Sequence, residues 1–186
     1  MIHMSHHNLM KAELVNAKFW YLIKLRTPWL LLGLLGALFA SLIVSKFELS
    51  LRENIALAFF IPMIAYMSDA IGTQTETVFI RALTDLKFDI GKYIVREIIL
   101  GATLGSIFGV LTGLLVFIVT GSMQVGEVVA ISLFLTMSVA TGLACLTPIL
   151  LRSLKQDPAI GSGPFTTALQ YVVSLAVYFF VALIIL

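Results

Sequence analysis

The sequence predicts an all-α membrane protein with five transmembrane helices. Of its 186 residues, 60% are hydrophobic and 12% are charged, whereas an ordinary soluble domain is about 45–50% apolar and about 25% charged. The mean hydropathy is +1.04. A helix that crosses a bilayer needs about 20 mainly apolar residues, so the chain has room for roughly five spans and little else.

Five long apolar stretches account for the predicted helices, in the order Pro28–Ser45, Asn54–Leu83, Glu97–Thr120, Val128–Leu151 and Gly163–Leu186. A transmembrane β-barrel needs short strands with alternating polarity, and these runs are long and do not alternate. The single cysteine, Cys145, excludes a disulfide scaffold. The excess of Leu, Ile, Val and Phe excludes a disordered chain. A net charge of +2 without a basic stripe argues against nucleic-acid binding.

The lysines and arginines indicate how the chain is oriented in the membrane. Ten of them fall on one side of the five spans, namely Lys11, Lys18, Lys24, Arg26, Arg81, Lys87, Lys92, Arg96, Arg152 and Lys155. The other side has only Lys46 and Arg52. Because basic residues are retained on the cytoplasmic side, we expect the N-terminus inside, the C-terminus outside and a multi-pass location in the cell membrane.

The first 26 residues are predicted to form a tail and an amphipathic helix on the inner membrane surface, ahead of a pore domain at 27–186. Leu9, Val15 and Phe19 lie near one face of this helix, and most of its lysines lie on others. The alternative is that the arm is the frayed start of the first span.

The second span carries a polar stripe. Asp69, Thr73 and Glu76 share one helix face, at positions i, i+4 and i+7. An ionisable group at bilayer depth is costly and by default a functional candidate. The stripe either lines a cation path, because carboxylate and hydroxyl oxygens suit hard cations, or is satisfied by hydrogen bonds within a helix bundle.

The fifth span carries a second stripe, in which Gly163, Thr167 and Gln170 recur at i, i+4 and i+7. Pro164 and Gly161 weaken the backbone at its start. We expect a broken helix whose freed carbonyl groups line a cavity, with an ordinary proline at a helix start as the alternative.

The third and fourth spans contain small residues at helical spacing, which we interpret as helix packing. Glycine recurs every fourth residue in the third span, at Gly101, Gly105, Gly109 and Gly113, and Ser138, Thr141 and Cys145 share a face of the fourth. Glu97, beside Arg96, is either an interfacial ion pair or helix-end charge, or a carboxylate at which ions enter from the cytoplasm.

Enzymatic chemistry is not expected, and neither is a bound cofactor. The only histidines are His3, His6 and His7. They lie in a terminal tail, where a metal site is a weak interpretation. The spans contain no nucleophile, nucleotide or paired-aspartate motif.

Several of these segments resemble one family. Pro62–Gln74 reads P-M-I-A-Y-M-S-D-A-I-G-T-Q and resembles the second-helix signature of MgtE-type magnesium transporters, whose usual form is P-x-x-A-x-M-G-G-N-x-G-x-Q. Arg26–Leu30 resembles the start of the family's first helix, and Asp157–Phe165 its fifth-helix signature. The resemblance covers residues 20–186. It implies a homodimer that passes hydrated Mg²⁺ through a pore between the protomers, here without the family's cytoplasmic Mg²⁺-sensing domains.

The departures from the family pattern concern the pore itself. The family's selectivity aspartate falls seven residues after the signature proline, which here is Tyr171, or Gln170 with a one-residue slip. The family's second-helix asparagine matches Ala70, and Asp69 replaces a neighbouring glycine. Glu97 matches the family's third-helix glutamate. We hypothesise that Asp69 supplies the charge missing at Tyr171.

Three functions follow from this pattern. The first is a divalent-cation channel or transporter, expected to carry Mg²⁺, whose metal-facing residues are Asp69, Thr73, Glu76, Glu97, Gly163, Thr167, Gln170 and Tyr171. The second is the same fold with a changed ion, and the third is a non-conducting structural membrane protein. The first two predict an ion flux that an Asp69 substitution weakens, and the third predicts no flux.

Overall fold

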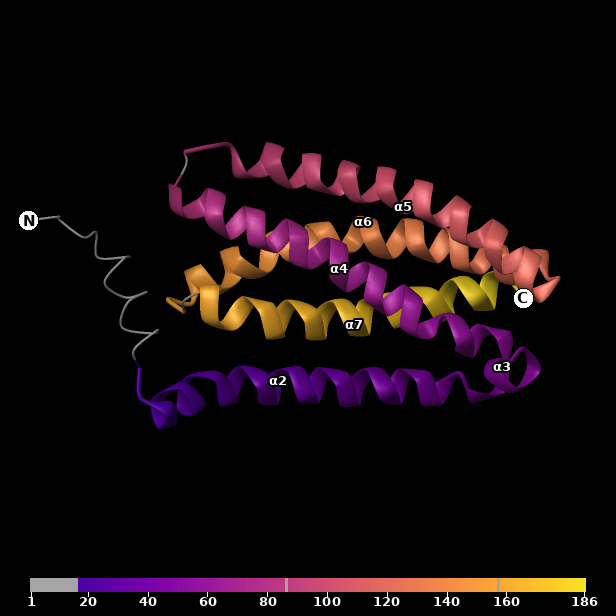
Figure 1. The fold of residues 1–186 in the computed structure, drawn as a ribbon, viewed down its shortest axis with the longest axis horizontal. Helices are drawn as coiled ribbons and strands as arrows, with labels where there is room; N and C mark the ends of the chain where they lie inside the picture. Colours follow the sequence, from indigo (N-terminus) through magenta and orange to yellow (C-terminus); the bar gives the residue numbers. More distant parts are fainter. Residues whose placement is uncertain (1–16, 86, 157) are drawn as a thin grey trace, which may run out of the picture.

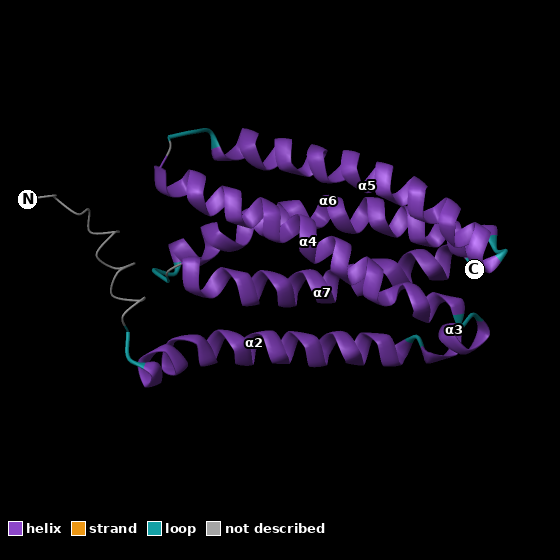
Figure 2. Cartoon of the chain, viewed as in Figure 1, coloured by secondary structure: helices purple, strands orange, loops and turns teal. Residues whose placement is uncertain are grey.

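The computed structural model describes residues 17–85, 87–156 and 158–186, and its regular structure is helical throughout (Figure 1; Figure 2). The helices are α2 (Phe19–Lys46), α3 (Glu48–Glu53), α4 (Ala56–Asp85), α5 (Ile90–Thr120), α6 (Met123–Ser153) and α7 (Pro158–Ile185). The three histidines and the first part of the predicted arm lie outside the described residues.

Five of these helices are long and apolar enough to cross a membrane, which confirms the predicted fold class. They contain 28 to 31 residues, or about 42–46 Å at 1.5 Å per residue. A hydrocarbon core is only about 30 Å thick. The helices therefore continue beyond their apolar stretches into the polar interface. Hydropathy does not reveal where a helix ends in that region.

The first span shows the largest difference from its predicted start. It begins at Phe19 rather than at Pro28. Residues 19–26, which we predicted in the interfacial arm, belong to α2, so this part of the arm fits the alternative of an early start of the first span. α5 and α7 likewise begin at Ile90 and Pro158 rather than at Glu97 and Gly163.

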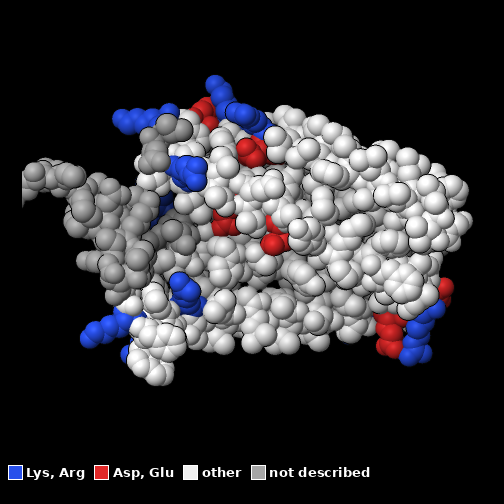
Figure 3. Space-filling view, viewed as in Figure 1, with Lys and Arg blue, Asp and Glu red and all other residues white. Residues whose placement is uncertain are grey.

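The spans run alternately up and down. The start of α2 and the α4–α5 and α6–α7 connections lie at one end of the bundle, and α3, the α5–α6 connection and the C-terminus lie at the other (Figure 1). Lys and Arg side chains gather at the first end, whereas a small group of both signs lies at the second (Figure 3). That group includes the Arg52–Glu48 ion pair, in which Arg52 Nη2 lies 2.6 Å from Glu48 Oε1.

α6 is the centre of the bundle and α2 lies at its edge. In their most apolar windows, 61% of the α6 residues are buried, against 6% of those in α2. α6 packs against α4, α5 and α7, and α2 packs mainly against α7. Much of the surface of α2 is therefore left for lipid or for a partner.

The four glycines that recur at every fourth position of α5 form its contact with α6, in agreement with the predicted role in helix packing. All four are buried. A Cβ atom at Gly109 would lie 2.6 Å from the Ala130 carbonyl oxygen, and one at Gly101 would lie 2.6 Å from that of Met137. A methyl group does not fit at these distances, so the two backbones can approach closely only with glycine. Thr141 and Cys145 are buried on the same side of α6.

The prediction of a broken fifth helix was wrong. α7 is continuous from Pro158 to Ile185 with Pro164 inside it. Pro164 removes one hydrogen bond, to the Ile160 carbonyl near the helix start, and helices tolerate this loss when their neighbours satisfy the freed group. α2, α4 and α6 also continue through an internal proline, at Pro28, Pro62 and Pro148.

We predict that Gly109→Ala destabilises the protein by about 1–3 kcal/mol, because the added methyl meets backbone rather than a movable side chain. Gly91→Ala is the matched control in the same helix, since its Cβ would make only an ordinary contact, 3.4 Å from the Asp89 carboxylate. Thermal unfolding in detergent, followed by circular dichroism, measures both. Equal melting temperatures for the two variants would contradict close α5–α6 packing.

Candidate functional site

The polar stripes predicted on the second and fifth spans meet at the contact between α4 and α7. The Thr167 hydroxyl donates a hydrogen bond to Asp69 Oδ1, at 2.8 Å. These residues are 98 positions apart in the sequence, and their pairing brings the candidate acid of α4 to the polar face of α7. We call this contact the α4–α7 seam. Its polar side chains are Asp69 and Glu76 of α4 and Ser162, Thr166, Thr167 and Gln170 of α7.

Glu76 is the most deeply buried acid of the seam. Its relative exposure is 5%, and its carboxylate lies beside the hydroxyl groups of Ser162 and Thr166, close enough to Asp69 for an electrostatic interaction. Glu76 Oε1 and Thr166 Oγ1 are buried without a partner that meets hydrogen-bond geometry in the described part of the chain, although the Ser162 and Thr166 hydroxyl groups lie within reach of the carboxylate. The two ion pairs found among the described residues do not include Glu76.

Gln170 completes the seam on the α6 side. It is 1% exposed, and its Nε2 donates to the Ala140 carbonyl of α6 at 3.2 Å. Its Oε1 is buried without a partner among the described residues. Its amide packs directly on Gly72, so a Cβ at this position would displace the end of the glutamine side chain. Glycine at this position of α4 therefore lets the amide lie against the helix backbone.

The arrangement places hard oxygen ligands in a buried contact. A buried carboxylate without a counter-charge is unfavourable, and so are buried acceptors without donors. A cation would satisfy the carboxylate, hydroxyl and amide oxygens together. No three His, Cys, Asp or Glu side chains of the described residues come together. Such a site suits an ion like Mg²⁺, which binds through one or two carboxylates and keeps several waters.

The remaining predicted residues lie elsewhere. Thr73 and Gly163 are exposed on the surface beside the seam. Tyr171 is 38% exposed and lines a groove between α7 and α2 that includes Leu30. Thr167 lines the same groove while bonding Asp69, so the groove and the seam adjoin.

Glu97 belongs to a different contact, between α4 and α5. It accepts a hydrogen bond from the Thr75 hydroxyl at 2.9 Å. The predicted helix-end position was wrong, because α5 begins at Ile90 and its N-cap is Asp89, whose side chain accepts from the Lys92 amide. No ion pair joins Glu97 to Arg96 within the described residues.

The predicted polar stripe of α7 agrees with its buried face at Gln170 but not at Gly163 and Thr167, which are exposed. The buried polar residues of α7 are Ser162, Thr166, Gln170 and Ser174. They recur at every fourth position, which is itself a helical face. This pattern is visible in the sequence, but it competes with the neighbouring stripe of Gly163 and Thr167, and only the contact with α4 distinguishes them.

Five helices long and apolar enough to cross a membrane define an integral membrane protein. The chain belongs to the MgtE family. The model of this family, described as a divalent cation transporter, matches residues 61–181. The magnesium transporter MgtE of Bacillus subtilis is 41% identical over 160 residues, which are 84% of this chain and 36% of the relative.

Two further relatives carry the same name. The magnesium transporter MgtE of Enterococcus faecalis is 33% identical over 84% of this chain and 35% of its own length. That of Thermus thermophilus is 32% identical over 87% of this chain and 36% of its own length. The chain thus spans about a third of the length of these relatives.

We predict that Mg²⁺ raises the melting temperature of the wild type and that Glu76→Gln abolishes the increase, because an amide keeps the shape but loses the charge. An ion at ten times its dissociation constant stabilises a protein by about 1.4 kcal/mol. Glu53→Gln is the control, since Glu53 is an exposed acid in α3. An equal Mg²⁺-dependent increase in both variants would exclude Glu76 as a ligand.

Proposed function

We propose that this chain forms a path for Mg²⁺ across the cell membrane and that the α4–α7 seam lines it. The observation that carries the proposal is the set of buried oxygens on Glu76, Thr166 and Gln170 that have no hydrogen-bond partner among the described residues. At bilayer depth such atoms have no bulk water with which to form hydrogen bonds. A passing cation with part of its water shell would satisfy them.

The relatives support Mg²⁺ as the ion. All three are named as magnesium transporters, and the family is described as a divalent cation transporter. The ligand chemistry agrees, because carboxylate, hydroxyl and amide oxygens are hard ligands. Asp69 and Glu76 lie two turns apart on α4 and offer successive positions for an ion along the helix.

The polar surface of a single protomer supports a pore between two copies. Thr73, Gly163 and Thr167 are exposed beside the seam, and Figure 3 shows acidic side chains on this face away from both ends of the bundle. Polar groups at bilayer depth are poorly placed against lipid. A second copy related by a twofold axis would cover them and present each acid twice.

The basic residues support a cytoplasmic N-terminus. Described lysines and arginines gather at the bundle end that contains the start of α2 and the α4–α5 and α6–α7 connections (Figure 3). Positive charge of this kind is retained on the cytoplasmic side. The C-terminus would then lie outside.

Asp69 is the proposed replacement for the carboxylate that the family has at the position of Tyr171. Its hydrogen bond to Thr167 places it one helical turn from Tyr171 along α7. The carboxylate that faces the ion path would then belong to α4 rather than to α7. The aromatic ring of Tyr171 lines the neighbouring groove.

We predict that Asp69→Ala lowers Mg²⁺ uptake into liposomes about tenfold or more, the effect of losing about 1.4 kcal/mol of interaction with the ion. Glu53→Ala, at an exposed acid outside the spans, is expected to transport like the wild type. Uptake that is equal in all three proteins would exclude Asp69 as a site residue. Folded wild type without uptake would favour a different ion or a non-conducting protein.

A double variant that moves the carboxylate from α4 to α7 tests directly whether Asp69 replaces the family's aspartate. We expect Asp69→Ala combined with Tyr171→Asp to recover uptake, because the carboxylate returns to the family position about one turn away. Asp69→Ala combined with Tyr171→Asn is the uncharged control. The hypothesis fails if the aspartate and asparagine variants transport equally.

A further inference from the structure

Two tyrosines lie at nearly the same depth in the bundle, one on each helix of the α4–α7 seam. The hydrogen bond between Asp69 and Thr167 fixes the register of the two helices, which run in opposite directions (Figure 1). Tyr66 precedes Asp69 by three residues on α4, and Tyr171 follows Thr167 by four residues on α7. Both offsets lead toward the bundle end that contains α3, and they amount to about 4.5 and 6 Å.

Both phenol groups are exposed far from the ends of their helices. Tyr66 is 70% exposed and Tyr171 is 38% exposed, and at least two turns of helix continue on either side of each. Tyrosine is enriched at the membrane surfaces, where its hydroxyl meets water. Inside the bundle, the buried Tyr178 instead donates to the Leu57 carbonyl. The other two hydroxyls have no such partner among the described residues, so they require one outside this protomer.

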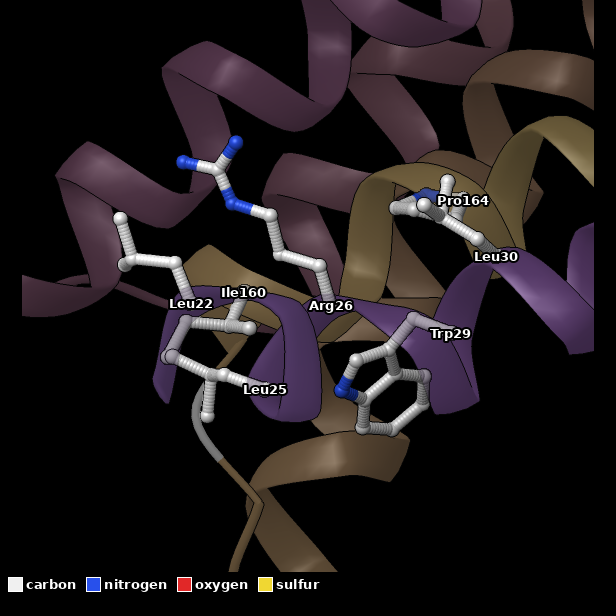
Figure 4. A pocket seen from close by; sticks show the side chains of 7 residues that line it. All are labelled: Leu22, Leu25, Arg26, Trp29, Leu30, Ile160 and Pro164. Carbon is white, nitrogen blue, oxygen red and sulfur yellow. The ribbon is translucent and has the colours of Figure 1, made fainter. Parts of the chain in front are cut away.

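The groove between α2 and α7 has hydroxyl groups only at this level. The cavity that contains Tyr171 has a volume of about 450 Å³, and Thr167 supplies its other hydroxyl. An adjoining cavity of about 430 Å³ continues toward the basic end of the bundle, with mainly apolar walls and Arg26 as the one charged residue among the described residues that line it (Figure 4). A guanidinium repels a cation. The groove therefore offers a cation favourable contacts only beside the seam.

Tyr66 belongs to the polar surface that the proposed function covers with a second copy. It precedes the exposed Thr73 by seven residues, which is close to two turns of helix, so the two side chains leave α4 in nearly the same direction. Asp69 lies between them and is half-buried. The phenol, the candidate acid and the threonine thus follow one another along the surface of α4.

We propose that Tyr66 and Tyr171 form a collar of hydroxyl groups beside the ion path, one turn from Asp69 toward the α3 end, and that these hydroxyls bind the water shell of the passing cation. The inference rests on the proposed function. A phenol hydroxyl is neutral and both donates and accepts hydrogen bonds, so it can hold the waters that Mg²⁺ retains. A second copy related by a twofold axis would add two more rings at the same level.

Substituted cysteines test the position of the collar without a transport measurement. The single cysteine, Cys145, is buried and is replaced by alanine as the background. In vesicles we expect Tyr66→Cys and Tyr171→Cys to react about tenfold faster with a trimethylammonium methanethiosulfonate than with a sulfonate one, because Asp69 attracts the first reagent and repels the second. Val110→Cys, on the exposed apolar face of α5, is the control and is expected to react with neither.

Removal of the hydroxyl alone tests its role. We expect Tyr66→Phe and Tyr171→Phe each to lower Mg²⁺ uptake into liposomes about two- to tenfold, the effect of losing one neutral hydrogen bond. Tyr21→Phe is the matched control, because Tyr21 is an exposed tyrosine near the start of α2, and it is expected to transport like the wild type. Unchanged uptake in both collar variants would overturn the role of the hydroxyls.

The two experiments separate the collar from the proposed function. Labelling of neither tyrosine position above the Val110→Cys control would overturn the collar in a protein that transports Mg²⁺, since both side chains would then face lipid or a contact without water. Equal rates with the two reagents would also overturn it, because a cation path beside Asp69 prefers the cationic reagent. Labelling with the expected preference in a folded protein without Mg²⁺ uptake would support the collar and refute the proposed ion.

Discussion

The rest of the structure depends on the absence of bulk water at bilayer depth, because the polar side chains of α4 and α7 must then find their partners within the protein. Gln170 packs its amide on Gly72 of α4 and donates to the Ala140 carbonyl of α6. Asp69 and Thr167 pair across the same contact. The seam thereby sets how α4 and α7 face each other and leaves unpartnered oxygens for an ion.

The apolar packing holds this seam in place. Glycine contacts fix α5 on α6 at the closest distance that backbones allow. Toward the end of the bundle that contains α3, Tyr178 of α7 donates to the Leu57 carbonyl of α4 at 2.8 Å. There Phe47 also stacks on Phe179, with ring centroids 4.5 Å apart. Aromatic residues thus pack the bundle end that contains α3. The polar contacts between α4 and α7 lie between these aromatic residues and the basic end.

α7 lies between the α4–α7 seam and the groove beside α2. One side of it faces α4 and the seam, and another faces α2 and the groove. Thr167 belongs to both, since it bonds Asp69 and lines the groove.

The five spans and the glycine packing of α5 followed from the sequence alone, because the length and polarity of a span are properties of the chain itself. So did the presence of polar residues on the two spans that became α4 and α7. Helix ends did not, because polar terminal turns carry no hydropathy signal. The tertiary structure decided that Ser162, Thr166 and Gln170 are buried while Gly163 is exposed. The rotation of a helix about its axis is set by the neighbours against which it packs, and no local pattern contains it.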